Sequence, residues 1–158
     1  MVLMVRATGA ARASAAPTQV VAATEKAEVR LTVPASWHRS IVPGMDLAVE
    51  GPEGVVLIED GPLQPEASTN PELLPILANA VYGDWPGFQV TPVRMGAIGK
   101  DSCSVLEVTG RNPETDANLR IQLQLVCKDD FFVLLRLAAP ADSWSVGRPV
   151  LERIGQSL

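Results

Sequence analysis

The chain has 158 residues, of which 47% are hydrophobic and 20% are charged, a profile typical of one globular domain that can bury an adequate core. Its net charge is −5 and its Lys and Arg residues form no cluster, so it lacks the basic surface from which nucleic-acid affinity arises, and we expect no nucleic-acid partner. No apolar stretch approaches the roughly 20 residues that span a bilayer, so we expect no transmembrane segment.

Residues 1–25 differ in composition from the rest, and we expect a flexible tail or the remnant of a targeting sequence there, ahead of one domain at 26–158. This segment is rich in Ala and carries Arg6 and Arg12 without an acid before Glu25. The two arginines interrupt the continuous apolar centre that a secretory signal needs. A flexible tail, an organellar transit peptide and what is left of an export signal all remain open. The first predicts a cytoplasmic protein, and a targeting remnant predicts the cell envelope or the thylakoid lumen.

The first expected elements are a strand and a hairpin. Apolar and polar residues alternate over 29–33, and Pro34 marks the end of this strand. The turn that follows brings the large aromatic side chain of Trp37 back toward the core. Strands over 45–50 and 55–59 flank a loop that contains Gly and Pro, which predicts a hairpin.

One helix is expected near the middle of the chain. The sequence Asn-Pro-Glu at 70–72 offers a cap, a first-turn proline and an early acid. Pro75 removes a backbone hydrogen bond in the first turns and indicates an irregular start, and Gly83 ends the helix. Its expected apolar stripe consists of Leu73, Leu74, Leu77, Ala80 and Val81.

The second half of the chain predicts a meander and a closing helix. The meander has a tight turn at 128–130 and a longer, exposed and mobile loop after Gly110. Apolar residues then recur at helical spacing over 150–158, and Pro149 suits the first turn of that helix. The four strands expected here are 88–93, 103–109, 119–127 and 131–138.

The meander strands carry apolar residues on both faces, so the sheet needs a cover on each side. We therefore expect an α+β fold, an α/β/α sandwich around a central, mainly antiparallel sheet of about six to seven strands.

The alternation of side chains along the strands also predicts on which faces of the sheet the two cysteines lie. Cys127 shares a face with the row of leucines that begins at Leu119, whereas Cys103 lies on the opposite parity from Leu106 and Val108. A disulfide needs converging Cβ vectors, so we expect two reduced thiols, with Cys127 buried.

No cluster of residues predicts catalysis, a metal or a cofactor. His38 is the only histidine, and its neighbours Ser36 and Ser40 in a turn do not make a nucleophile and a base, so we expect no catalytic residue and no enzyme. The acid pairs at 59–60 and 129–130 lack the spacing of a calcium loop and are interpreted as turn-solvating groups. The stretch Gly-Ala-Ile-Gly-Lys at 96–100 lacks the rest of a phosphate loop and is interpreted as a strand-to-strand loop.

Partner binding is the remaining kind of site. Aromatic side chains dominate binding surfaces but also plug the ends of small cores, and both interpretations stay open here. Loops held on a rigid sheet are where function usually lies. The candidate partner-binding residues are Trp37, Trp85, Phe88, Asn112, Glu114 and Asp116.

Several stretches resemble a known superfamily. They are the strand with its proline at 29–34, the aromatic Trp37, the sequence Trp-Pro-Gly-Phe at 85–88, the meander, and the closing segment 151–158. Together they resemble the PsbP/Mog-like superfamily, most closely its LpqN-type and DcrB-like members, from about Lys26 to the end of the chain.

The resemblance implies a scaffold rather than a catalytic residue. It implies a non-catalytic protein-binding module, an accessory subunit or a chaperone-like factor, in a photosynthetic, secretory or envelope assembly. The chain departs from the LpqN type in that no cysteine precedes Cys103 to bear a lipid. The alternative is a carrier of a small ligand or lipid, with a pocket between sheet and helix.

Overall fold

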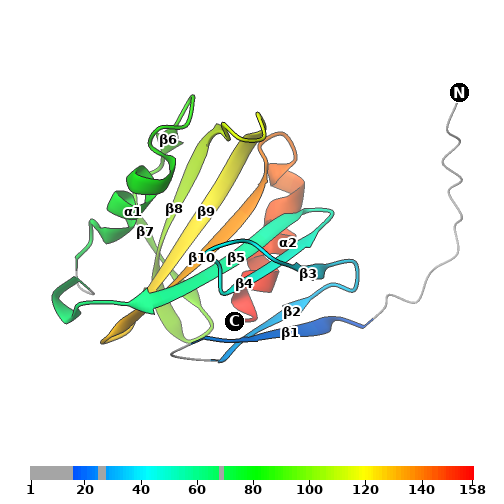
Figure 1. Cartoon of the computed structure of the whole chain (residues 1–158), viewed down its shortest axis with the longest axis horizontal. Coiled ribbons are helices and arrows are strands. Elements are labelled where there is room, and N and C mark those ends of the chain that lie inside the picture. The colour runs from blue at the N-terminus through cyan, green and yellow to red at the C-terminus, as the bar shows by residue number, and fades with distance from the viewer. Residues whose placement is uncertain (1–15, 25–27, 68–69) are drawn as a thin grey trace, which may run out of the picture.

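Two antiparallel sheets organise the part of the chain that the computed structural model describes, residues 16–24, 28–67 and 70–158. Within these residues, seven strands of the large sheet pair in the order β3-β4-β5-β10-β9-β8-β6, and the eighth, β7, pairs with β8. A second sheet consists of β1 (Thr18–Ala23) and β2 (Glu28–Val33) (Figure 1). The strands of the large sheet are β3 (His38–Ser40), β4 (Leu47–Gly51), β5 (Gly54–Pro62), β6 (Gln89–Val90), β7 (Arg94–Ile98), β8 (Asp101–Arg111), β9 (Asn118–Cys127) and β10 (Phe131–Pro140).

A helix covers each face of the large sheet. After the short 3-10 helix η1 (Pro65–Ala67), α1 (Leu73–Tyr82) packs on β8 and β9, and we call this side the α1 face. On the opposite side, the α2 face, α2 (Trp144–Gln156) lies over β10 and β5 and contacts β2 of the small sheet (Figure 1). The predicted α+β sandwich is confirmed. The sheet has more strands than expected because β3 is only three residues long and β7 lacks an alternating pattern.

Alternation along β10 lets one strand serve two cores. Leu134 and Ala138 join the core on the α1 face, whereas Leu135 and Leu137 join the core on the α2 face. Leu135 and Leu137 are 0% exposed, and burying a leucine completely contributes about 1.5–3 kcal/mol. The sheet is therefore covered on both faces, as the apolar residues on both faces of its strands predict.

The helix α1 begins at Leu73 with Glu72 as its N-cap, so Asn70 and Pro71, expected as cap and first-turn proline, lie in the turn before it. The Asn70 side-chain oxygen accepts a hydrogen bond from the Glu72 backbone N–H at 2.9 Å. Pro75 is the third residue of the helix, where a backbone N–H has no intrahelical partner to lose. The helix therefore starts regularly, contrary to the expectation, and Gly83 follows its last residue.

The buried side of α1 differs in part from the predicted stripe. Leu74, Ala78 and Tyr82 are buried at helical spacing, with Leu73 and Leu77 partly buried. Ala80 and Val81 are exposed instead, Val81 by 51%. The helix thus lies on the sheet along the line of residues 74, 78 and 82, which leaves the flank near its C-terminal end in solvent.

The closing helix α2 begins earlier than predicted. It starts at Trp144, which is buried against the α2-face core, so Pro149 lies inside the helix rather than in its first turn. A Cβ at Gly147 would lie only 2.6 Å from the Glu53 backbone oxygen. Glycine at this position therefore lets the helix approach the β4–β5 turn closely.

The strand β1 lies inside the segment 1–25, for which the sequence predicts a flexible tail or a targeting remnant. It pairs along its whole length with β2, from Thr18 opposite Val33 to Ala23 opposite Glu28. The predicted boundary near residue 25 therefore falls between two paired strands, because the pairing with β2, rather than any strong local pattern, specifies β1. Residues 1–15 lie outside the described residues, and the targeting remnant expected there stays a prediction.

The two cysteines are free and lie on opposite faces, as alternation predicts. Cys103 belongs to the α2-face core and Cys127 packs against the α1-face core. The expected burial is wrong in one respect, since Cys103 is buried and Cys127 is only half-buried. Cys127 is the last residue of β9, next to the turn into β10.

Candidate functional site

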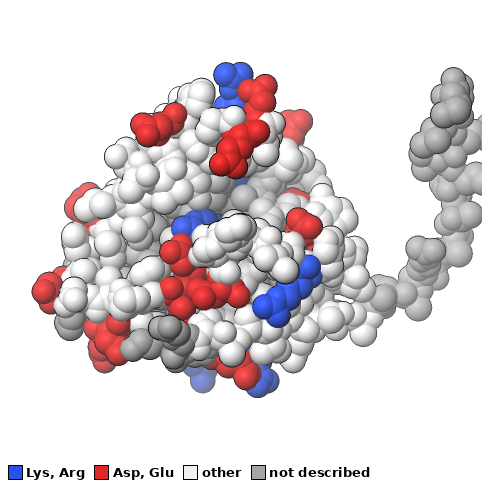
Figure 2. Space-filling model, in the orientation of Figure 1, with Lys and Arg blue, Asp and Glu red and all other residues white. Residues whose placement is uncertain are grey.

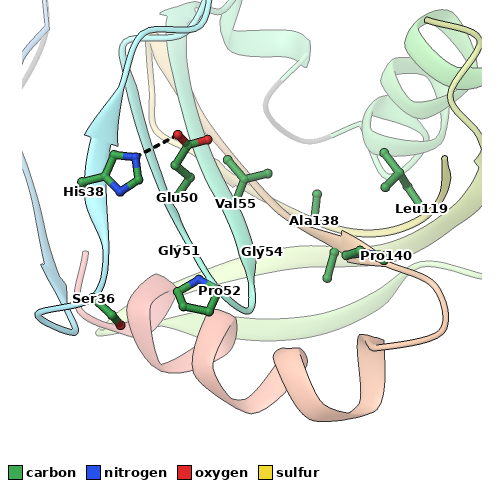
Figure 3. Close-up of a pocket in the computed structure, with 11 residues that line it drawn as sticks. Ser36, His38, Glu50, Gly51, Pro52, Gly54, Val55, Leu119, Ala138 and Pro140 are labelled. Atoms are coloured by element: carbon green, nitrogen blue, oxygen red, sulfur yellow. Dashed lines mark hydrogen bonds and ion pairs between the residues drawn. The ribbon is translucent and has the colours of Figure 1, made fainter. Parts of the chain in front are cut away.

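An open groove at one end of the large sheet is the candidate site (Figure 3). We call it the end groove. It has a volume of about 600 Å³ and lies largely on the part of the α1 face formed by β4, β5 and β10, and Leu119 of β9 also lines it. Its lining residues are Ser36, His38, Glu50, Gly51, Pro52, Gly54, Val55, Leu119, Ala138, Ala139 and Pro140.

The strand register builds the floor of the end groove. His38 lies opposite Glu50, Glu50 opposite Val55, and Val55 opposite Ala138. Because directly opposed residues of an antiparallel sheet share a face, these four side chains form one row across the strands. Figure 3 shows this row, with Leu119 beyond it on β9. The side chains of Val55, Ala138 and Leu119 make the floor apolar.

The histidine of the end groove pairs with a carboxylate. His38 Nε2 lies 2.9 Å from Glu50 Oε1, and both side chains are exposed. Ser36 lines the same groove but its side chain lies well away from the imidazole (Figure 3). Cys103 belongs to the opposite face of the sheet. The described residues around His38 therefore supply no activated nucleophile of the kind that acyl transfer needs.

The aromatic candidates divide between the two cores. Trp37 is 4% exposed in the α2-face core, and its Nε1 donates to Glu53 Oε2 at 2.8 Å. Trp85 packs edge-to-face on Tyr82 with ring centroids 5.0 Å apart, and Trp85 and Phe88 are half-buried against the α1-face core. Trp37 and Trp85 therefore do not form one aromatic end.

The structure brings Trp85 and Phe88 to the predicted loop between β8 and β9. The Arg111 backbone N–H donates to the Pro86 oxygen at 2.9 Å. A Cβ on Gly110 would lie 3.3 Å from Trp85 Cβ, so the end of β8, just before the loop, packs directly on this aromatic side chain. Leu119, in β9 just after the loop, lines the end groove, which makes the loop and the groove neighbours.

The β8–β9 loop is exposed, as predicted, and it is held by its own hydrogen bonds. Asn112 Oδ1 accepts from the Glu114 N–H at 2.9 Å, and the Asn112 oxygen accepts from the Asp116 N–H at 2.8 Å. Asp116 has φ of 58°, a left-handed conformation that Asp tolerates better than most residues. Arg111 Nε lies 3.3 Å from Asp116 Oδ1. Exposed acids are thus presented in fixed positions.

One of the two acidic pairs expected to solvate a turn lies in a strand instead. Glu59 and Asp60 lie inside β5 rather than in a turn, and Glu59 Oε2 accepts from Arg136 Nη2 at 2.7 Å. Asp129 and Asp130 do lie in the β9–β10 turn. Among the described residues, no group of three or more His, Cys, Asp and Glu side chains could hold a metal ion.

The glycine-containing stretch at 96–100 is divided between a strand and a turn. Gly96 to Ile98 complete β7, and Gly99 and Lys100 form the turn into β8. Gly99 has φ of 57°, which suits a tight turn. The strand was not visible in the sequence because its central residues are glycine and alanine.

Burial raises the pKa of three side chains. Desolvation raises the pKa of Tyr82, and the Arg136 guanidinium beside it opposes part of that rise. Desolvation also raises the pKa of Cys103 and of Cys127. A thiol with a raised pKa is a poor nucleophile near neutral pH, so neither cysteine has the character of a catalytic thiol.

No protein-family model matches the sequence, and no curated protein matches it significantly. Solved structures do match the fold. Cyanobacterial PsbP from Synechocystis superposes with a TM-score of 0.58 at 11% identity, over 95% of this chain and 96% of that one. LpqN of Mycobacterium tuberculosis, a protein involved in cell envelope biogenesis, gives 0.51 at 15% identity, over 80% of this chain and 79% of that one.

A Bacteroides thetaiotaomicron protein also matches, with a TM-score of 0.52 at 9% identity over 79% of this chain. This chain spans 43% of the length of that protein. The chain therefore has the PsbP-like fold shared by PsbP and LpqN, and the predicted resemblance is confirmed at the level of fold. Of the helices in the described residues, neither is long and apolar enough to cross a membrane.

Proposed function

We propose that this chain is a non-catalytic protein-binding module, acting as an accessory subunit or a chaperone-like factor of a larger assembly. The observation that carries the proposal is the end groove, whose apolar floor the described residues leave open beside an exposed, hydrogen-bonded loop. Apolar surface rimmed by polar groups is typical of protein interfaces. The proposed interface consists of the end groove together with Trp85, Phe88, Asn112, Glu114 and Asp116.

Trp37 has an indirect role in this proposal. Its ring lies against Gly51, where a Cβ would meet the indole at 2.4 Å, and Gly51 lines the end groove. The buried indole therefore supports the groove from the opposite side of the sheet. A binding partner would not touch Trp37 itself.

Charge supports a partner with basic groups at its rim. Glu114 and Asp116 are exposed on the loop, and Glu50 is exposed at the groove. Acidic side chains are also spread over the face of the molecule seen in Figure 2, and they gather near its centre. Complementary charge at the rim of an interface speeds association and selects partners more than it adds affinity.

The cellular setting of the partner is proposed from the similar solved structures and from the sequence resemblance together. LpqN is involved in cell envelope biogenesis, which favours an envelope assembly for this chain. The likeness to PsbP keeps a photosynthetic assembly as a second setting, and the DcrB-like resemblance keeps a secretory one.

The test is affinity purification of the full chain from its own cells, followed by mass spectrometry. Val55→Asp places a charge on the floor of the end groove, and Val146→Asp makes the same change at a 74% exposed position on α2. We expect a partner that co-purifies with the wild type and with Val146→Asp but is lost with Val55→Asp, while circular dichroism shows all three folded. A partner retained by Val55→Asp, or no partner for the wild type, would contradict the proposal.

A second candidate function, that of a ligand or lipid carrier, has its own observation. A groove of about 420 Å³ lies where β2, the large sheet and the end of α2 meet. Its apolar lining includes Val29, Ile98, Val126, Phe131, Val133 and Leu158. If it holds an acyl chain, a fluorescent fatty acid should bind the wild type saturably and bind Val133→Lys at least tenfold more weakly. Absence of saturable binding to the wild type would exclude this role.

A further inference from the structure

Two buried glutamines on the α2 face have unpaired oxygens. Gln122 and Gln124 of β9 are 1% and 5% exposed. The Oε1 atom of each has no hydrogen-bond partner among the described residues. Buried polar side chains are nearly always satisfied by protein, water or a ligand, so these two unpaired oxygens on one face of β9 mark a place that can accept hydrogen bonds.

The two glutamines line a small cleft between β7 and α2. The cleft has a volume of about 230 Å³, and Val105 of β8 completes its floor. Its β7 wall contains Gly96, which presents no side chain to the space. The volume is below the roughly 300–1,000 Å³ of pockets for drug-sized ligands, so the occupant must be small.

Charges of opposite sign stand on the two walls of this cleft. Arg94 comes from β7, and Glu152 comes from α2. Arg148 Nε donates to Glu152 Oε1 at 2.8 Å and holds that carboxylate in place. The cleft therefore offers a cation for a ligand carboxylate, and it offers a carboxylate and two amide oxygens for ligand N–H donors.

We propose that this cleft binds a small free α-amino acid as its zwitterion. The ammonium group would donate to Glu152 and to the Gln122 and Gln124 oxygens, and the carboxylate would accept from Arg94. The two amide oxygens are closed to solvent in this structure, so in this proposal the side chains at the mouth of the cleft move when the ligand enters. This site is on the opposite face from the end groove floor and does not depend on the function proposed above.

Isothermal titration calorimetry of the full chain with glycine, L-serine and L-asparagine tests the proposal. We expect saturable binding of at least one of the three, with a dissociation constant of about 1 mM or tighter. Acetate and ethylamine each carry one of the two charges, so each should bind at least tenfold more weakly.

Variants locate the site. Arg94→Gln and Glu152→Gln change partly or fully exposed side chains, and each should weaken binding about tenfold or more. Arg153→Gln, which removes an exposed charge from the same helix outside the cleft, should leave the affinity unchanged. No saturable binding of any of the three amino acids at 10 mM (roughly ten times the expected constant), or binding that survives both Arg94→Gln and Glu152→Gln, would overturn the proposal.

Discussion

Arg136 Nη2 lies 2.7 Å from Glu59 Oε2 across two paired strands of the large sheet. The Arg136 side chain is 8% exposed and that of Glu59 is 33% exposed. The guanidinium also lies against Met45 Sδ and beside Tyr82. Glu59 is thus the carboxylate that pairs with this buried cation among the described residues.

Glu59→Gln should therefore destabilise the protein. Loss of a fully buried partner costs about 3–5 kcal/mol, and the partial exposure of Glu59 lowers our expectation to about 2 kcal/mol. Urea unfolding at neutral pH measures the change. Glu28→Gln, which removes the partner of the exposed Arg30, is the matched control and should change stability by less than about 0.5 kcal/mol. Equal effects of the two variants would contradict this role of Glu59.

Tyr82 is the only tyrosine, so its ionisation can be followed directly by absorbance at alkaline pH. Burial raises its pKa above the ordinary value of 10.0. The folded protein therefore holds this proton more tightly than the unfolded chain does. The stability that it contributes is complete below pH 10.0 and is lost as the pH rises toward the folded pKa.

Two outcomes follow for Tyr82. The tyrosinate absorbance should titrate at a higher pH in the folded protein than in urea. Tyr82→Phe should lose less stability between pH 9.5 and pH 11 (roughly the span around a free tyrosine pKa) than the wild type loses. A folded-state titration at or below the value in urea would show that the hydroxyl is not desolvated.

Cysteine reactivity tests the opposite placement of the two thiols. Both pKa values are raised by burial, and Cys103 is 2% exposed, so Cys103 should react with Ellman's reagent only when the protein unfolds. Cys127 should react measurably faster in the native state, because it is half-buried. Single Cys→Ala variants assign the two rates. Faster native reaction at Cys103 would contradict its place in the α2-face core.

Gly147 tests the close approach of α2 to the β4–β5 turn. Alanine normally stabilises a helix interior by about 1 kcal/mol relative to glycine. Here the added Cβ would meet the Glu53 oxygen at 2.6 Å, so Gly147→Ala should instead destabilise by about 1–3 kcal/mol. The exposed Ser145→Ala on the same helix should have little effect. A higher melting temperature for Gly147→Ala would show that the helix can move away without cost.

The sequence predicts those elements that alternate strongly or recur at helical spacing. Strands β8, β9 and β10 and the β4–β5 hairpin fall where expected, and so do the two faces of the sheet. The strands β1, β3 and β7 could not be predicted, because each is specified by its partner strand. The start of α2 was missed because Trp144 is placed by the core, whereas Pro149 suggests a later start.

The candidate site was predictable only in part. The sequence singled out the loop after Gly110 and the aromatic residues Trp85 and Phe88, which the fold brings to the same end of the sheet. It could not reveal the end groove, whose floor depends on the register of strands β5, β9 and β10. Sequence distance also hid the pairing of Arg136 with Glu59.

Site-specific photo-crosslinking tests the central claim, that a partner protein docks at the end groove and the β8–β9 loop. A benzoylphenylalanine at position 114 on the exposed loop would lie at the proposed interface, and the same residue at position 146 on α2 would lie on the other face. The account predicts one dominant crosslinked protein from position 114 and none from position 146 in the cells that make this chain. Crosslinks to the same protein from position 146 alone, or none from position 114, would contradict it.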